Sequence, residues 1–123
     1  MLWKKQKFDD ELRLLGEADT LAFGGVGFAG SLLPATKAYF AVEEALREHG
    51  ADLRPRLETL LDKGSPAGRI YAAELLTHAD ARAGRAAWER LESARDEVKT
   101  FTGCIMGSTT VGQYAANRLH SPH

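Results

Sequence analysis

The 123-residue chain contains a single cysteine, Cys104. One cysteine excludes an intramolecular disulfide, and a tetrahedral structural zinc site normally draws on several cysteines. The sequence also contains no H-E-x-x-H motif and no paired Cys/His spacing, and its four histidines are dispersed: His49, His78, His120 and His123. We therefore expect no metal and no cofactor, and a reducing, cytoplasmic compartment fits best.

Long apolar runs are also missing, since no stretch approaches the roughly 18 apolar residues of a membrane span. The basic N-terminus, 1–7, leads into Asp9-Asp10-Glu11, where a signal peptide would place apolar residues. We expect no membrane association; the alternative is a chain that has lost its leader.

Charge of one sign is lacking as well. Sixteen basic and 17 acidic side chains give a net charge of −1, and the two signs are interspersed. The chain thus has no overall field that would attract nucleic acid. Helix-borne arginines could still track phosphates, which leaves weak nucleic-acid binding as a minority hypothesis: Arg54, Arg56, Arg69, Arg82, Arg85, Arg90 and Arg95.

What is present is a helical pattern. Hydrophobic residues make up 44% of the chain and charged residues 27%, which is typical of a globular protein and suits one domain over residues 1–123. Apolar spacing, prolines at helix starts and glycines at helix ends predict helices over 8–15, 34–49, 52–63, 66–78, 80–94 and 108–119. Residues 19–33, which are rich in glycine, and 99–107, which are β-prone, are predicted to be irregular.

The helix over 66–78 stands out because it is apolar almost all round. Ser65-Pro66 supplies a cap and a first-turn proline, and Ile70 to Ala73, Leu75 and Leu76 surround the axis. A helix of this kind is covered on more than one side, so we expect it in the middle of a stack.

A weak internal repeat accompanies these helices. A shift of about 31 residues brings Leu57 onto Trp88, Leu60 onto Leu91, Ala67 onto Val98 and Ile70 onto Phe101. Chance similarity between amphipathic helices is the competing explanation.

The stretch Leu57–Leu76 resembles a HEAT repeat of the short bacterial type. It has a leucine-lined helix, a Gly/Ser/Pro turn, an arginine early in the second helix and an alanine-rich buried run. The resemblance implies an all-α fold, a short stack of antiparallel helical hairpins with five to six helices and glycine-rich irregular segments, and a surface that binds another macromolecule. The glycine-rich and Cys104 segments depart from this pattern and look like features of a family of bacterial proteins without an assigned activity.

Gly25-Val26-Gly27-Phe28-Ala29-Gly30 matches the G-x-G-x-x-G pattern of dinucleotide-binding loops. The preceding Thr20–Phe23 makes a feeble strand, and Pro34 would fall inside the helix that should already be running. We favour a tight buried connection where two helices approach closely, and keep Gly25, Gly27 and Gly30 as ligand-binding candidates.

Cys104 is the only candidate catalytic residue. Near a helix N-terminus, a thiol can become a nucleophile. No histidine is near in sequence to act as its base, and lone cysteines more often pack as small hydrophobes.

The function we predict is a non-enzymatic protein-binding module, such as a small adaptor or a toxin-neutralising immunity protein; a homo-oligomer stays open. Phe40, Trp88 and the turn containing Ser65 and Arg69 are the predicted partner contacts. The alternative is a small enzyme or ligand-binding protein built on Cys104 and the Gly24–Gly30 segment. If residues 24–30 and 102–108 meet in the folded chain, a shared ligand or catalytic site becomes credible; if they lie at opposite ends, each segment has only a local structural role.

Overall fold

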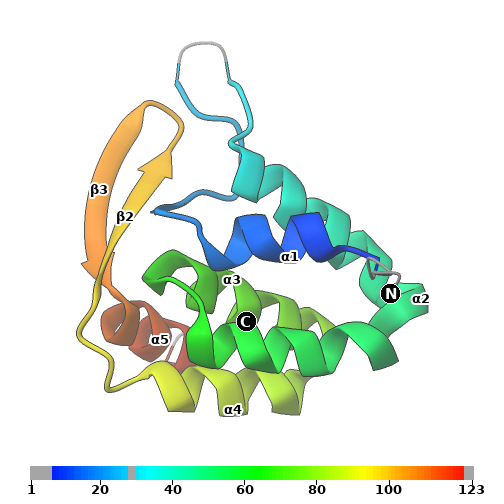
Figure 1. Ribbon diagram of the computed structural model, residues 1–123. Coiled ribbons are helices and arrows are strands. Elements are labelled where there is room, and N and C mark those ends of the chain that lie inside the picture. The colour runs from blue at the N-terminus through cyan, green and yellow to red at the C-terminus, as the bar shows by residue number, and fades with distance from the viewer. Residues whose placement is uncertain (1–6, 28–29, 121–123) are drawn as a thin grey trace.

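The computed structural model describes residues 7–27 and 30–120, and within them the chain folds into five helices and a three-stranded mixed sheet (Figure 1). The all-α prediction was therefore wrong. In chain order the elements are α1 (Asp9–Gly16), β1 (Thr20–Leu21), α2 (Pro34–Lys63), α3 (Pro66–Ala79), α4 (Ala81–Leu91), β2 (Glu97–Thr102), β3 (Ile105–Thr110) and α5 (Val111–His120).

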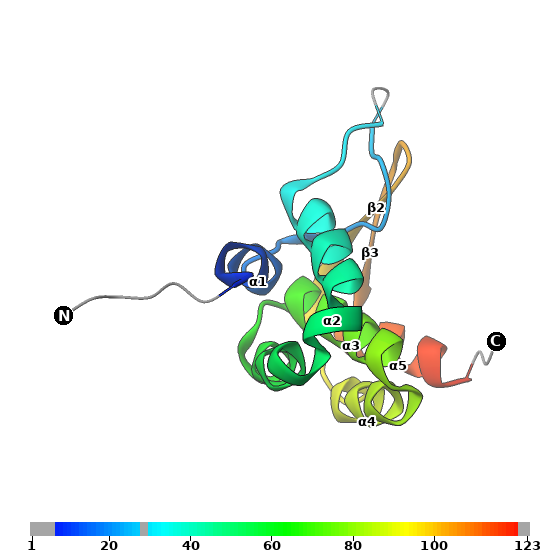
Figure 2. The ribbon, with the colours of Figure 1, turned by 90° about the vertical axis from the view of Figure 1, so that its right-hand side faces the viewer.

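The prediction of a central helix is confirmed by α3, which contacts all the other helices and both β1 and β2. Its apolar residues Ile70 to Ala73, Leu75 and Leu76 have essentially no exposed surface. Ser65 caps the helix, since its Oγ accepts a hydrogen bond from the Gly68 N–H at 3.0 Å. Figure 2 shows α3 surrounded by α1, α2, α4 and α5.

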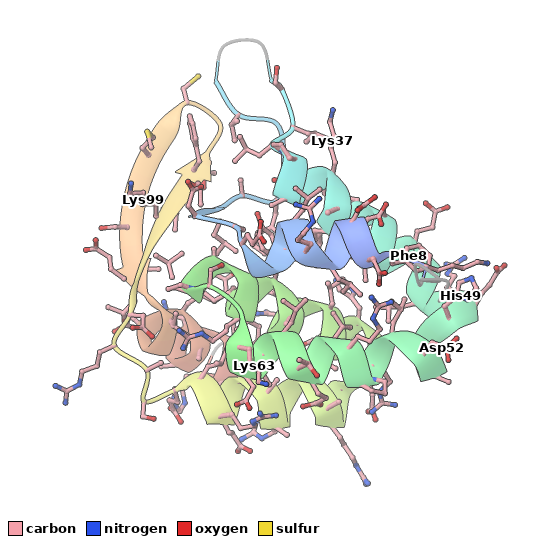
Figure 3. All side chains as sticks on the ribbon, in the orientation of Figure 1. Phe8, Lys37, His49, Asp52, Lys63 and Lys99 are labelled. Atoms are coloured by element: carbon pink, nitrogen blue, oxygen red, sulfur yellow. The ribbon has the colours of Figure 1, made fainter. Side chains whose placement is uncertain are left out.

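Two predicted helices are joined in α2, which bends instead of stopping at Gly50. His49 leaves helical geometry, with φ −120° and ψ 20°, and the chain resumes the helix at once in a new direction. The ring of Phe8 lies 5.6 Å from the His49 ring, so the start of α1 packs against the bend (Figure 3).

The sheet arises from segments that were predicted to be irregular or helical. β1 pairs with β2 in parallel, and β2 pairs with β3 antiparallel over six residue pairs, from Glu97–Thr110 to Thr102–Ile105. Gly103 and Cys104 form the connection; the φ of +60° at Gly103 alone is the pattern of a type II′ turn. Because β3 continues to Thr110, the last helix is capped by Thr110, whose Oγ1 accepts from the Gln113 N–H at 3.0 Å, and not by Ser108.

The sheet also overturns the internal repeat. The residues that the shift aligned with α3, Val98 and Phe101, lie in β2, so α4 is followed by a strand and no second helical hairpin completes a copy. Leu57 and Leu60 are aligned with helical residues of α4, but Ala67 and Ile70 in α3 are aligned with strand residues. Among the described residues, no helix combines the length and apolarity needed to cross a membrane.

Candidate functional site

The two irregular segments of the sequence meet in the fold. Val26 forms a parallel β-bridge with Gly103, and the Gly27 N–H donates to the Gly103 carbonyl at 2.8 Å. Figures 1 and 2 show the glycine-rich loop and the β2–β3 hairpin rising from the same end of the molecule, beyond the helices.

Close backbone contact explains the glycines of this loop. Val26 and Ser31 exchange backbone hydrogen bonds of 2.8 and 3.1 Å, which folds the loop back on itself. A Cβ on Gly25 would lie 2.3 Å from the Gly30 carbonyl oxygen, and Gly27 and Gly30 have φ of +73° and +63°. The close approach is between the two arms of one loop, so the prediction that two helices approach closely at these glycines was wrong.

The loop also departs from a dinucleotide-binding turn. β1 has only two residues, and α2 begins at Pro34, several residues after the last glycine. Phe28 and Ala29, which complete the motif, lie outside the described residues. In a dinucleotide fold the loop runs directly into a helix whose N-terminus holds the pyrophosphate, and this loop does not.

A buried hydrogen-bond cluster fixes the start of the loop to the helices. The Tyr71 hydroxyl on α3 accepts from the Ala22 N–H at 2.9 Å and donates to the Ala22 carbonyl at 2.8 Å. The Thr36 hydroxyl on α2 donates to the same carbonyl at 2.8 Å. Burial raises the pKa of Tyr71, so its hydroxyl stays protonated and able to donate. The cluster holds Ala22, and with it the end of β1, in one position.

A hollow of about 460 Å³ lies between the loop and the hairpin. Backbone, hydroxyl and apolar groups line it: Leu21, Ala22, Phe23, Gly24, Gly25, Thr100, Phe101, Thr102, Gly103 and Tyr114. This lining contains no carboxylate, imidazole, amine, guanidinium or thiol. Among the described residues, the phenol of Tyr114 is thus the one titratable side chain in this lining.

Tyr114 is held in place by its own hydrogen bond. Its hydroxyl donates to Glu74 Oε2 at 3.1 Å, and Arg118 Nη2 donates to Glu74 Oε1 at 2.9 Å. The Arg118 guanidinium lies 5.5 Å over the Trp88 ring, and the Trp88 and Tyr114 rings are 5.6 Å apart. Burial, with the nearby Glu74 carboxylate, raises the pKa of Tyr114. The hollow therefore has a rigid wall whose one phenol stays neutral.

Exposed apolar side chains stand at the end of the hairpin. Ile105 is 74% exposed and Met106 62% exposed, and Leu32 is exposed on the neighbouring loop. We call the surface formed by Cys104, Ile105 and Met106 the hairpin tip. Large apolar groups exposed together on an ordered element are typical of an interaction surface.

Cys104 is exposed in the turn of the hairpin, not buried as a packing residue. It precedes a strand instead of a helix, so no helix N-terminus acts on its thiol. Within the described residues the thiol makes no hydrogen bond or ion pair, and it does not line the hollow. The structure thus places Cys104 beside the glycine loop, in the exposed turn of the hairpin.

Three of the four predicted partner contacts are engaged within the fold, and Trp88 supports the wall of the hollow through its contact with Tyr114. Trp88 is 3% exposed, and its indole N–H donates to the Thr77 hydroxyl at 3.2 Å. Ser65 donates to the Ala18 carbonyl at 2.6 Å as well as capping α3, and Arg69 pairs with Asp96 at 2.9 Å. Phe40 is 39% exposed on α2, so it alone of these presents apolar surface.

Sequence reasoning missed Ile105 and Met106. The signal was available: two β-prone segments, Lys99–Thr102 and Ile105–Thr110, flank a Gly-Cys pair, and Gly-X is the sequence of a type II′ hairpin. Ile105 and Met106 then follow the turn at the exposed end of the hairpin, whereas Val98 at its other end is buried in the core.

A larger hollow of about 640 Å³ lies between α2 and the end of α3, lined by Glu43, Glu44, Leu46, Arg47, His78 and Ala79. Its charged groups partly satisfy one another, since His78 Nε2 is 2.9 Å from Glu43 Oε2. Through residues 7–27 and 30–120, no three His, Cys, Asp or Glu side chains lie close enough together to hold a metal ion.

Comparison of the chain with protein-family models, with curated proteins and with solved structures finds no match. What the chain does is therefore inferred from the geometry of this end of the molecule.

Proposed function

We propose that the chain is a non-enzymatic protein-binding module that contacts its partner through the hairpin tip and the adjoining hollow. The observation that carries the proposal is the exposure of Ile105 and Met106, 74% and 62%, on an ordered hairpin. Their burial against a partner would contribute roughly 1–2 kcal/mol each. Methionine is enriched at protein interfaces, where its flexible side chain adapts to the partner's surface.

The hollow supports the same function. Its volume of about 460 Å³ and its apolar lining groups suit an apolar side chain of the partner. Its walls are held by Tyr71, Thr36 and the Tyr114–Glu74 pair before any partner arrives. A surface that is already ordered loses less conformational entropy on binding. The lack of a titratable group in the lining other than Tyr114 favours binding over catalysis.

The test compares two apolar-to-acidic variants, Ile105→Glu at the hairpin tip and Phe40→Glu on α2. Both residues are exposed, so neither change buries a charge within the chain. The wild-type chain immobilised on resin should retain a stoichiometric protein from its native lysate. Ile105→Glu should bind that protein about tenfold or more weakly, because a carboxylate desolvated at the interface costs at least about 1.4 kcal/mol.

Phe40→Glu should bind as the wild type does, with the fold of both variants checked by circular dichroism. If Phe40→Glu loses the partner and Ile105→Glu keeps it, the contact surface is on α2 and the proposed surface is wrong. If the wild-type chain retains no stoichiometric protein, the proposed function is wrong.

The hollow favours one second candidate function, the binding of a small apolar molecule. Its volume of about 460 Å³ and its apolar lining are suitable for such a ligand. An apolar fragment library should then shift the amide resonances of Gly24, Gly25 and Thr102, and the substitution Thr102→Lys should abolish those shifts. If no fragment moves these resonances, the small-ligand function is refuted.

A further inference from the structure

The outer edge of β3 carries unpaired backbone groups. In a two-residue hairpin the residues that close the turn, here Thr102 and Ile105, form a hydrogen-bonded pair, and such pairs alternate along the ladder. Gly107 and Thr109 therefore point their backbone groups toward β2. Met106, Ser108 and Thr110 point theirs away from it, and β3 is the end strand of the sheet. Figure 1 shows β3 along the margin of the molecule.

This edge has none of the features by which proteins prevent strand addition. Natural edge strands are blocked by lysine, proline, bulges or inward-pointing charges. β3 reads Ile-Met-Gly-Ser-Thr-Thr, with no proline and no charged residue, and its one-to-one register with β2 over six pairs leaves no bulge. The residues from Ile105 to Ser108 are exposed. The edge is thus open to another strand.

The same neutral sequence indicates what that strand is. In an antiparallel pair, residues opposite each other are either both hydrogen-bonded or both not, so a two-fold pairing of β3 with itself must be centred on a residue. Centred on Ser108, it places Ser108 against Ser108 and Met106 against Thr110. The outward backbone groups of Met106 and Ser108 then pair, as does the N–H of Thr110, whose carbonyl also begins α5. No charge faces its own copy in this arrangement.

The nearest charges of the sheet do not oppose it either. Lys99 on β2 pairs with Ser108, so two copies of Lys99 would be separated by three strand spacings. At roughly 4.8 Å per spacing this is about 14 Å, which exceeds the screening length at physiological salt. A strand from a charged partner would find no complementary charge on β3, whereas a second copy matches it.

We propose that two copies of the chain associate through their β3 edges, antiparallel and centred on Ser108, so that the two three-stranded sheets become one. This association goes beyond the proposed function: it uses backbone groups along the outer edge of β3, where Met106 is the one residue that also belongs to the hairpin tip. The dimer would present two such binding surfaces.

The test measures association by sedimentation equilibrium of the whole chain, from low to high micromolar concentration. Ser108→Pro removes an outward N–H that makes no bond to β2, a change that edge strands tolerate. Ser108→Val is the matched control, because it changes the same side chain and keeps the N–H. The wild type and Ser108→Val should dimerise, and Ser108→Pro should associate at least about tenfold more weakly.

Hydrogen exchange supplies an independent measurement. The amides of Met106 and Ser108 should exchange more slowly as the concentration rises, while Gly107 and Thr109 should not change, because their N–H groups already face β2. If Ser108→Pro does not fold, Ser108→Asp replaces it: facing carboxylates should weaken the dimer at low salt, and high salt should partly restore it.

A wild-type chain that stays monomeric at high micromolar concentration overturns the proposal, as does a Ser108→Pro variant that folds and dimerises like the wild type. Neither result bears on the proposed function, which Ile105→Glu tests separately.

Discussion

The hydroxyl of Tyr71 offers the sharpest test of how the candidate site is held. Tyr71→Phe removes one oxygen from a fully buried side chain and leaves the ring packed as before. That oxygen accepts the Ala22 N–H and donates to the Ala22 carbonyl, and the carbonyl has a second donor in Thr36. The substitution therefore leaves the carbonyl bonded but the buried N–H without its partner.

The magnitude follows from this asymmetry. A buried amide that loses its acceptor costs about 1–3 kcal/mol, so Tyr71→Phe should lower the free energy of unfolding by that amount. Thr36→Val should cost about 0.5–1.5 kcal/mol, because Tyr71 still bonds the carbonyl. In the double variant both groups of Ala22 lose their partners, so the loss should exceed the sum of the single losses by about 1 kcal/mol.

Equilibrium urea unfolding monitored by circular dichroism measures all three values. Tyr39→Phe is the control: this buried tyrosine makes no hydrogen bond through its hydroxyl within the described residues, so its loss should stay within about 0.5 kcal/mol. If Tyr71→Phe costs no more than Tyr39→Phe, or if the two single losses simply add, the cluster does not hold Ala22 as we have argued.

Two further predictions concern stability. Gly84→Ala should destabilise the fold by about 1–3 kcal/mol in thermal unfolding, because its Cβ would lie 2.2 Å from the Thr77 hydroxyl where α4 crosses α3. Gly50→Ala is the contrasting variant: its Cβ meets no atom within 4 Å, so the substitution should stabilise the fold by about 0.5–1 kcal/mol. Burial raises the pKa of three tyrosines above the ordinary value of 10.0, so the unfolded chain loses these protons first. The neutral forms of Tyr39, Tyr71 and Tyr114 therefore stabilise the fold fully below pH 10, and this contribution should fall as the pH rises above 10. The urea midpoint of unfolding should decrease up to about pH 11, and a midpoint that stays constant would contradict this prediction.

The helical part of the fold was predictable because its signals are local. Ser65-Pro66 begins α3 as expected, and the Asp80 side chain accepts from the Arg82 N–H at the start of α4. The bend in α2 was less accessible: Gly50 reads as a helix end, and the continuation of the helix past it is accompanied by contacts with a distant segment, Phe8 against His49 and Arg56 with Asp9. Helix ends depend on local capping, but helix directions depend on neighbours.

The sheet was missed because its strands are defined by their partners. β1 is two residues long and carries no recognisable pattern of its own; it is a strand only because Thr20 and Leu21 lie beside Lys99 and Thr100. The Gly103-Cys104 pair indicates a hairpin turn, but a helix was predicted to begin at residue 108, which is the middle of β3, so the second strand was not recognised.

The sequence by itself determined the helices from Pro34 to Leu91 and the central place of α3, since apolar spacing and caps act over a few residues. It also indicated that any chemistry or ligand binding would lie in residues 24–30 and 102–108, whereas it put the predicted protein contacts elsewhere, at Phe40, Trp88, Ser65 and Arg69. Only the tertiary structure decided that these segments meet at Val26 and Gly103, that Trp88 is buried while Ile105 and Met106 are exposed, and that β3 has an open edge. Contacts between residues so distant in the chain follow from packing as a whole, and no local pattern encodes them.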